Sequence, residues 1–343
     1  MVVAAAPTGA GTGTSKVGFF DLVLQQLQKL EKRVQDGDYY EAQQMYKSVH
    51  SRYMHAKKYS EAIELLSSGA VAMLKHGQVT CGTELGLLLI QTLTAAKVPF
   101  DNAAIDQIRA IFNAYPRAAD SQQESEASNS GVESSEATVA ARTRVEGCTS
   151  FLRAALKWSI ETGGFSRGAP ELHDMLGQYI WTESPAPVCT PNQHQEMMKA
   201  SQHFVRGNQP EAFAKVVVEC MNKCYPSEAD LVIARAVMLY LSLGNLRDAN
   251  RLWDSVRQRL SDSSQDFPDS PLLHFVKFLL STLERDALPL FRMLRQKYKP
   301  SLDRDPSLEE YLDEVAERFY NVQRRNGMQG MLGDFMKMFA MDS

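Results

Sequence analysis

Two short patterns in this 343-residue chain have residue types and spacing that could do chemistry. The first, Gly164 to Gly168, has the Gly-x-Ser-x-Gly form of the nucleophile elbow of serine hydrolases, with Ser166 as the candidate nucleophile. That elbow needs a buried strand before the serine and a helix after it, whereas the preceding residues have helical spacing and Pro170 follows almost at once. A serine hydrolase therefore remains only as the enzymatic alternative, and we expect no labelling of Ser166 by a fluorophosphonate probe.

The second pattern places Cys220 and Cys224 one helical turn apart, with His203 upstream. A zinc site would need four ligands, commonly in Cys-x2-Cys or His-x3-His pairs, so packing cysteines are the simpler interpretation. The Gly-rich leader, Gly9 to Gly13, has no preceding strand and no Gly-Lys-Ser/Thr to make it a phosphate loop. We therefore expect no catalytic residues, no metal site and no cofactor, which indicates a protein that is not an enzyme.

Composition excludes further classes of function. The net charge of −4 does not suit a nucleic-acid-binding protein, because such proteins usually carry a basic patch. The five cysteines form an odd set without paired spacing, which indicates reduced thiols and the cytosol. No apolar run approaches the length of a membrane-spanning helix, so we expect no direct membrane insertion.

A recurring turn indicates how the chain is built. Each copy combines Gly, Asp or Asn, and a later Glu-Ala or Asp-Ala pair between two apolar-periodic segments; the copies start at Gly37, Gly207 and Gly244, with a degraded one at Lys57. Gly tolerates the left-handed conformation that ends a helix, and Ala lets two helices approach closely. The pattern predicts an all-α, right-handed solenoid of irregular tetratricopeptide-like helical hairpins. Such stacks usually bind other proteins.

Hydrophobic periodicity and composition predict the boundaries of the helices and segments. Helices are expected from about Tyr39 to His55, Ser60 to Lys75 and Thr83 to Ala96. Composition divides the chain into a disordered leader (1–16), N-terminal helical repeats (17–117), an acidic Ser-rich disordered insertion (118–144), C-terminal helical repeats (145–322) and a Met-rich tail (323–343). The turn-rich residues 261–271 could hold a short β-hairpin or a plain loop. The apolar residues 272–283 are expected to be the hub of the C-terminal half.

Longer strings in the chain resemble a known family. They are the tyrosine-bearing turn at 37–46, Arg52-Tyr53, residues 59–65 and 68–70, Lys157-Trp158-Ser159, Leu172-His173 and the block at 298–312, YKPSLDRDPSLEEYL. Together they resemble the Golgi-to-ER traffic protein 4 family over most of residues 17–340. The resemblance implies a cytosolic adaptor of the GET pathway for post-translational targeting of tail-anchored proteins to the ER membrane.

The resemblance also implies partners. In that family the N-terminal helices bind the ATP-loaded targeting ATPase and restrain its hydrolysis. The C-terminal half holds the N-terminal segment of a ubiquitin-like-domain partner, which recruits a co-chaperone with its client, and animal members also contact a BAG-domain protein. A helical-repeat scaffold subunit of a proteasome-lid or translation-factor complex is the alternative. Those subunits end in a winged-helix module, whereas residues 300–343 show no alternating strand pattern.

Motif matching carries the family's ATPase-binding residues onto Lys29, Tyr39, Glu84 and Gln91. Gln91 departs from the family, since a carboxylate is expected there, and Tyr39 could instead only pack on the next helix. For the ubiquitin-like partner the residues themselves suggest an apolar surface. It consists of Leu272, Phe275, Phe278 and Leu279, with an ordinary core as the alternative for each.

Overall fold

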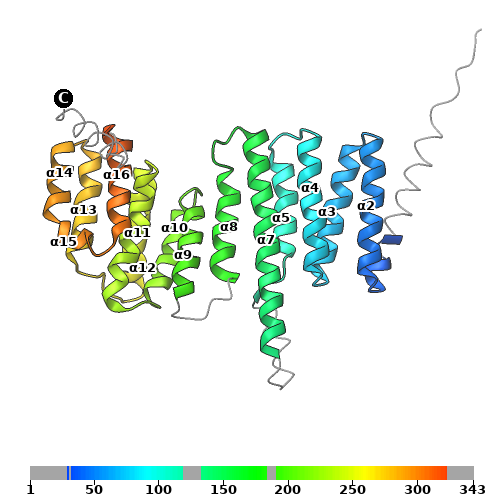
Figure 1. Ribbon diagram of the computed structural model, residues 1–343, viewed down its shortest axis with the longest axis horizontal. Coiled ribbons are helices and arrows are strands. Elements are labelled where there is room, and N and C mark those ends of the chain that lie inside the picture. Colours follow the sequence, from blue (N-terminus) through cyan, green and yellow to red (C-terminus); the bar gives the residue numbers. More distant parts are fainter. Residues whose placement is uncertain (1–28, 31, 119–132, 184–190, 323–343) are drawn as a thin grey trace, which may run out of the picture. The chain divides into compact units, whose positions relative to one another are not determined.

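The computed structural model describes residues 29–30, 32–118, 133–183 and 191–322 (Figure 1). Throughout these ranges the ordered elements are helices, and the residues divide into two compact units at Ala169 and Pro170. The leader, residues 119–132 of the expected insertion, and the Met-rich tail lie outside the described residues. The all-α prediction is confirmed, whereas residues 265–270 are irregular and form no β-hairpin.

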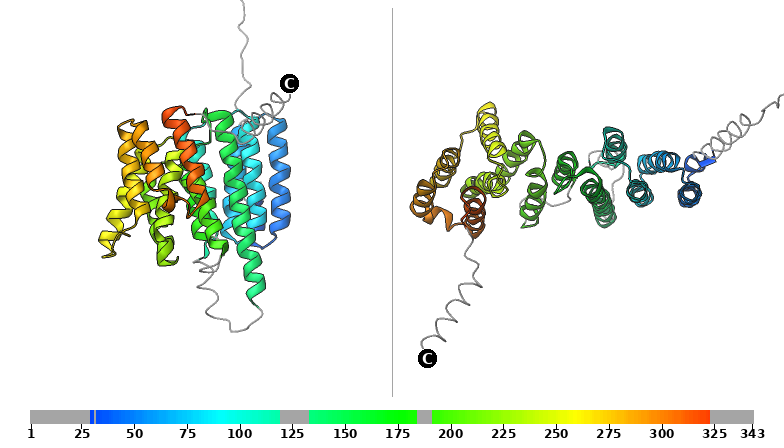
Figure 2. Two further views of the ribbon diagram at one scale, coloured as in Figure 1. Left: turned by 60° about the vertical axis from the view of Figure 1, so that its left-hand side comes forward. Right: turned by 90° about the horizontal axis from the view of Figure 1, so that it is seen from above.

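The first unit stacks its helices in two layers, seen end-on in Figure 2. Its helices are α2 (Tyr39–His55), α3 (Tyr59–Lys75), α4 (Val79–Ala95), α5 (Asn102–Ala114) and α7 (Glu133–Gly163). α2, α4 and α7 pack side by side, and α3 and α5 form the other layer. α7 takes in residues 133–144 of the expected insertion and runs past the ends of α4 and α5 (Figure 1).

The turns of the first unit recur at a fixed interval. Residues 37, 57, 77 and 97 all have positive φ and lie 20 residues apart, and α2, α3 and α4 each have 17 residues. After each helix the backbone closes in a Schellman turn, for example with the Lys58 N–H donating to the Tyr53 carbonyl at 2.9 Å. This closure satisfies the last carbonyls of one helix and lets the next begin two residues later.

Lysine occupies two of the four turn positions with positive φ. Lys57 (φ 56°) and Lys97 (φ 51°) hold the left-handed conformation that glycine holds at 37 and 77. Lys57→Gly is expected to stabilise the first unit by about 0.5–1 kcal/mol, because a side chain in this conformation is strained. Gly77→Ala is expected to cost about 1 kcal/mol through the backbone alone, since no atom lies within 4 Å of the added Cβ. Urea denaturation measures both; a loss of stability in Lys57→Gly would contradict the assignment.

The second unit is built around one helix that is almost entirely buried. Its elements are α8 (Pro170–Glu183), α9 (Pro191–Phe204), α10 (Pro210–Met221), η1 (Pro226–Glu228), α11 (Ala229–Ser242), α12 (Leu246–Asp262), α13 (Pro271–Glu284), α14 (Leu288–Lys297), α15 (Lys299–Leu302) and α16 (Pro306–Tyr320). Every residue of α11 except Arg235 is buried. α12, α13 and the returning α16 all pack on it. The hub is therefore α11, not the segment 272–283.

Ion pairs fix α16 against α11. Arg304 Nη1 lies 2.6 Å from Asp230 Oδ2, and Arg235 pairs with Asp305, which also caps the start of α16. Burial alone would raise the pKa of Asp305, but hydrogen bonds from Arg235 and Ser307 lower it overall. These pairs hold the last described helix in place.

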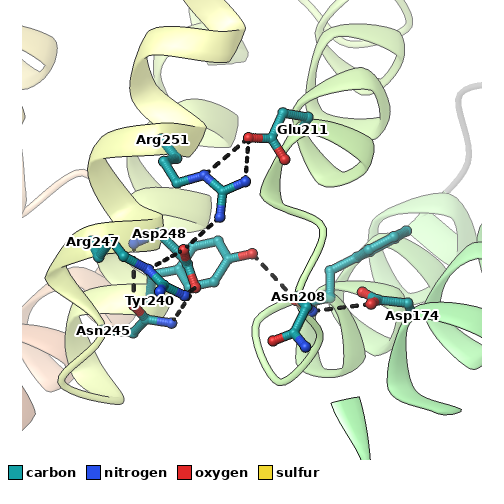
Figure 3. Close-up of polar contacts among 9 residues, drawn as sticks. Asp174, Asn208, Glu211, Tyr240, Asn245, Arg247, Asp248 and Arg251 are labelled. Atoms are coloured by element: carbon teal, nitrogen blue, oxygen red, sulfur yellow. Dashed lines mark hydrogen bonds and ion pairs between the residues drawn. The ribbon is translucent and has the colours of Figure 1, made fainter. Parts of the chain in front are cut away.

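Polar side chains of the repeat turns also connect neighbouring hairpins of this unit (Figure 3). Arg251 on α12 pairs with Asp248, the acidic residue of its own turn motif, and with Glu211, the equivalent residue at the start of α10. The buried Tyr240 hydroxyl donates to the Phe204 carbonyl at 3.2 Å. The repeat motif thus supplies contacts between hairpins as well as turns.

Asp174 is a buried acidic residue of α8. Its carboxylate lies under the turn between α9 and α10 and accepts the Asn208 backbone N–H at 3.0 Å (Figure 3). Burial raises its pKa to about 6, even though backbone N–H groups of Asn208 and Gln209 favour the charged form. The folded state therefore favours the neutral acid, so this stabilisation is complete below about pH 4 and is lost as the pH rises through about 6.

Asp174→Asn is expected to raise the free energy of unfolding by about 2 kcal/mol at about pH 7 and to change it little at about pH 4. The amide keeps an oxygen for the Asn208 N–H and carries no charge to desolvate. Denaturant titration at both pH values measures the difference. An equal effect at both would show that Asp174 does not titrate in this range.

Candidate protein-docking faces

The first candidate face centres on Glu84, an exposed carboxylate of α4. Two donors from α2 reach the same oxygen: Gln43 Nε2 lies 2.9 Å and Lys47 Nζ 2.6 Å from Glu84 Oε2. Gln43 is only 3% exposed, so its amide is fixed by packing. Among the described residues no hydrogen bond reaches Oε1. The carboxylate is thus held in one orientation with one oxygen open to another molecule.

A second polar contact joins α2 to α4 farther along. The Thr92 hydroxyl donates to the Leu88 carbonyl at 2.7 Å and lies 2.9 Å from His50 Nε2. Because the hydroxyl has a single hydrogen, His50 must be the donor through its Nε2–H. Burial lowers the pKa of His50, which favours this neutral form. Together with the contacts of Glu84, this hydrogen bond joins α2 to α4 along their length.

The structure brings some of the predicted ATPase-binding residues together. Tyr39 lies one turn before Gln43 on α2, so Tyr39 and Glu84 occupy the same end of the α2–α4 pair. The Tyr39 ring is partly buried and packs on the His76 ring, with centroids 5.8 Å apart. Gln91 is exposed about 10 Å farther along α4. No described contact links Lys29, which is exposed on the helical residues before α2, to the other three.

Tyr40 is a surface residue that sequence reasoning missed. Its side chain is 71% exposed, more than that of Tyr39 beside it. Helical phase could have shown this, since Ala42 and Tyr46 carry the buried stripe of α2 and Tyr40 lies away from it. We define the α2–α4 face as Tyr39, Tyr40, Lys47, Glu84 and Gln91.

The second candidate face lies on α13 and α14. Leu272, Phe275 and Leu279 are 0–1% exposed and belong to the core, whereas Phe278 is 48% exposed. Residues 272, 275 and 279 share one side of the helix, and Phe278 lies about 100° away from Leu279. Only Phe278 of the four can therefore touch another chain directly. Sequence reasoning missed Leu290 and Met293 on α14, which are 41% and 53% exposed. We define the α13–α14 surface as Phe278, Leu290 and Met293.

Neither Ser166 nor Cys220 has the surroundings that its proposed chemistry would need. Ser166 lies in irregular chain that follows α7, not a strand, and its neighbour Phe165 packs edge-on against Phe100 at 5.0 Å. Burial raises the pKa of the Cys220 thiol to about 11, so the metal-binding thiolate is disfavoured. Within the described ranges no group of three or more His, Cys, Asp or Glu residues is placed to hold a metal ion.

None of the helices in the described parts of the chain combines the length and apolar character needed to cross a membrane.

A family model and two similar proteins all indicate the same family. The family model of Golgi to ER traffic protein 4 matches residues 56–339. The chain is 48% identical over 324 residues to Protein GET4 of Arabidopsis thaliana, covering 93% of this chain and 96% of that protein. It is 30% identical over 314 residues to the Golgi to ER traffic protein 4 homolog of Homo sapiens, covering 90% and 84%.

A solved structure agrees with the fold. The crystal structure of C. therm. Get4 matches with a TM-score of 0.72 over 91% of this chain and 95% of that one, at 23% identity. At that identity the likeness shows the helical solenoid fold and no more. With the family model and the two relatives, the resemblance carried by the tyrosine-bearing turn is confirmed: the chain belongs to the Golgi to ER traffic protein 4 family, and its role lies in that traffic pathway.

Proposed function

We propose that this protein is a non-enzymatic adaptor in the delivery of tail-anchored membrane proteins to the ER. The α2–α4 face binds the ATP-loaded targeting ATPase. The second unit binds the N-terminal segment of a ubiquitin-like-domain protein, which recruits a client-bearing co-chaperone. Family membership supports the pathway, and the geometry around Glu84 supports the docking of a protein on the first unit.

The orientation of Glu84 is the observation that carries the proposal. An exposed carboxylate whose position is set by the buried Gln43 loses little freedom when a partner binds. Beside it, Tyr39 and Tyr40 offer broad amphipathic rings of the kind enriched at the centres of protein interfaces. Charge gives orientation and the tyrosines give contact area, a combination that suits a protein surface.

Restraint of ATP hydrolysis follows from differential affinity. An adaptor shifts its partner's conformational equilibrium only by binding one state more tightly than the others. We therefore expect the α2–α4 face to bind the ATP-loaded ATPase more tightly than the ADP-loaded form. Turnover then slows in proportion to the fraction bound.

The α13–α14 surface supports binding of the second partner. Phe278, Leu290 and Met293 are large apolar side chains left exposed on adjoining helices. Covering them would remove apolar area from water at roughly 25 cal/mol per Å². The buried Leu272, Phe275 and Leu279 then support this surface from beneath.

Size-exclusion chromatography with light scattering tests the proposal directly. The protein is mixed with the ATP-loaded ATPase, with the ubiquitin-like partner, and with both. We expect two binary complexes and one ternary complex, with slower ATP turnover in those that contain the ATPase. Competition between the two partners for one site, or elution of all three as separate species, would contradict it.

A further inference from the structure

A basic segment interrupts the second unit of this acidic chain. Residues 288–299, LPLFRMLRQKYK, contain four cations and no carboxylate, although the whole chain has a net charge of −4. They form α14 and the first residue of α15, at the edge of the unit in Figure 1. A local excess of one charge next to exposed apolar residues is typical of a binding surface.

α14 separates its buried and exposed sides clearly. Phe291 and Leu294 are buried against the unit, whereas Arg292, Met293 and Gln296 lie on the opposite, exposed side. Arg292 and Gln296, one turn apart, continue toward Lys299 and line an open groove of about 410 Å³. Arg295, Asp303 and Glu309 complete its lining. We define the basic groove as this set of six residues.

Two of the three cations that line the basic groove form no ion pair with the residues that the structure describes. Arg295 is held by Glu309 and by Asp313, whose Oδ1 lies 2.7 Å from Arg295 Nη1. Within the described ranges neither Arg292 nor Lys299 forms an ion pair, and the same is true of the neighbouring Lys297. Arg295 is thus occupied in fixing α14 to α16, while Arg292 and Lys299 remain available to an anionic ligand.

We propose that the basic groove receives an acidic amphipathic helix of the ubiquitin-like partner, an inference that rests on the proposed function. Carboxylates of that helix would meet Arg292 and Lys299, and its apolar side would cover Met293 and Leu290. Charge complementarity selects this occupant, since the segment is basic within an acidic chain. A groove lined by residues from α14 to α16 suits an amphipathic helix better than a flat anionic bilayer.

Charge reversal tests the groove. The Arg292→Glu/Lys299→Glu variant of the full chain is titrated with the purified ubiquitin-like partner at low and at high salt. We expect a loss of affinity of about tenfold or more at low salt and a flatter salt dependence than for the unaltered protein. Lys215→Glu/Arg318→Glu is the control, because it makes the same charge change at exposed cations of α10 and α16 and breaks only the exposed pair of Lys215 with Glu219. Binding of the ATPase should be unchanged in both variants.

Zero-length crosslinking supplies an independent readout. A carbodiimide joins an amine to a carboxylate only when the two are in contact, so Lys299 or Lys297 should be recovered by mass spectrometry linked to an Asp or Glu of the partner. Normal binding by the charge-reversed variant, without such a crosslink, would overturn the groove and leave the proposed function standing. No binding by the unaltered protein would overturn both. Phosphatidylserine vesicles are the third probe, and charge-dependent binding to them with partner affinity unchanged would assign the groove to lipid instead.

Discussion

Glu84→Lys is expected to weaken binding of the ATP-loaded targeting ATPase by about 2–3 kcal/mol, or roughly 30- to 150-fold in Kd. The change removes the acceptor oxygen that Gln43 and Lys47 hold in place and puts a second cation beside Lys47. A partner group that is drawn to a carboxylate would then be repelled. Fluorescence anisotropy with labelled, ATP-loaded ATPase measures the affinity, and restraint of hydrolysis should be lost in parallel.

Glu64→Lys is the matched control for this experiment. Glu64 is exposed on α3, in the other layer of the first unit, and its side chain has no ion pair among the described residues. It undergoes the same charge change without touching the α2–α4 face. Glu84→Gln should fall between the unaltered protein and Glu84→Lys, since it keeps the shape and loses the charge. Equal losses of affinity in Glu64→Lys and Glu84→Lys would indicate that only the overall charge of the unit matters. No loss of affinity in Glu84→Lys would show that Glu84 lies outside the interface.

Gly207→Ala is expected to destabilise the second unit by about 3 kcal/mol. A Cβ at this position would lie 1.8 Å from the Asp174 Oδ1 atom, far inside contact distance. Asp174 is itself buried and bound to the Asn208 N–H, so it cannot move aside without losing that hydrogen bond. Denaturant unfolding monitored by circular dichroism measures the cost.

Gly244→Ala and a double variant separate the causes. Gly244 occupies the corresponding turn before α12 with φ of 80°, and no atom lies within 4 Å of its added Cβ, so backbone strain of about 1 kcal/mol is all that is expected there. In an Asp174→Ala background the clash disappears, so Gly207→Ala should cost clearly less than in the unaltered protein. Strictly additive effects of the two substitutions would show that the carboxylate is not the obstacle.

Turn chemistry made much of the fold predictable. Gly37 and Gly244 begin copies of the motif and have the positive φ expected of a glycine that ends a helix, whereas Gly207 begins a third copy without it. The same reasoning placed a degraded copy at Lys57 but missed the turns at Gly77 and Lys97, so it did not give the regular 20-residue spacing. Local pattern also placed the start of the helix that ends near Ala96 at Thr83, whereas α4 begins at Val79. The Schellman turn at Gly77, not the apolar stripe, decides where the helix starts.

Which helix of the second unit is most buried was less predictable, because tertiary packing decides it. Residues 272–283 are very apolar, but α13 still leaves Phe278 exposed. α11 is enclosed because α12, α13 and α16 surround it, and α16 returns to it from some 70 residues farther along the chain, as the Arg304 to Asp230 pair shows. A single sequence does not reveal which of two apolar helices the later elements will cover.

The residues that orient Glu84 were also not predictable from the sequence. The family resemblance pointed to Glu84 and Tyr39, but the hydrogen bonds that orient Glu84 come from Gln43 and Lys47, about 40 residues earlier. Such partners are set by the stacking of α2 on α4, which no local pattern encodes. Tyr40, Leu290 and Met293 needed only helical phase, once the bounds of their helices were known.

The one-sided tethering of Glu84 also limits what its partner can be. A guanidinium binds a carboxylate most strongly as a two-pronged fork that engages both oxygens, and Oε2 already accepts from Gln43 and Lys47. A compact ammonium or a single backbone amide needs only Oε1. The group opposite Glu84 should therefore be a lysine or a main-chain N–H, and replacing that lysine with arginine in the partner should bring no gain in affinity.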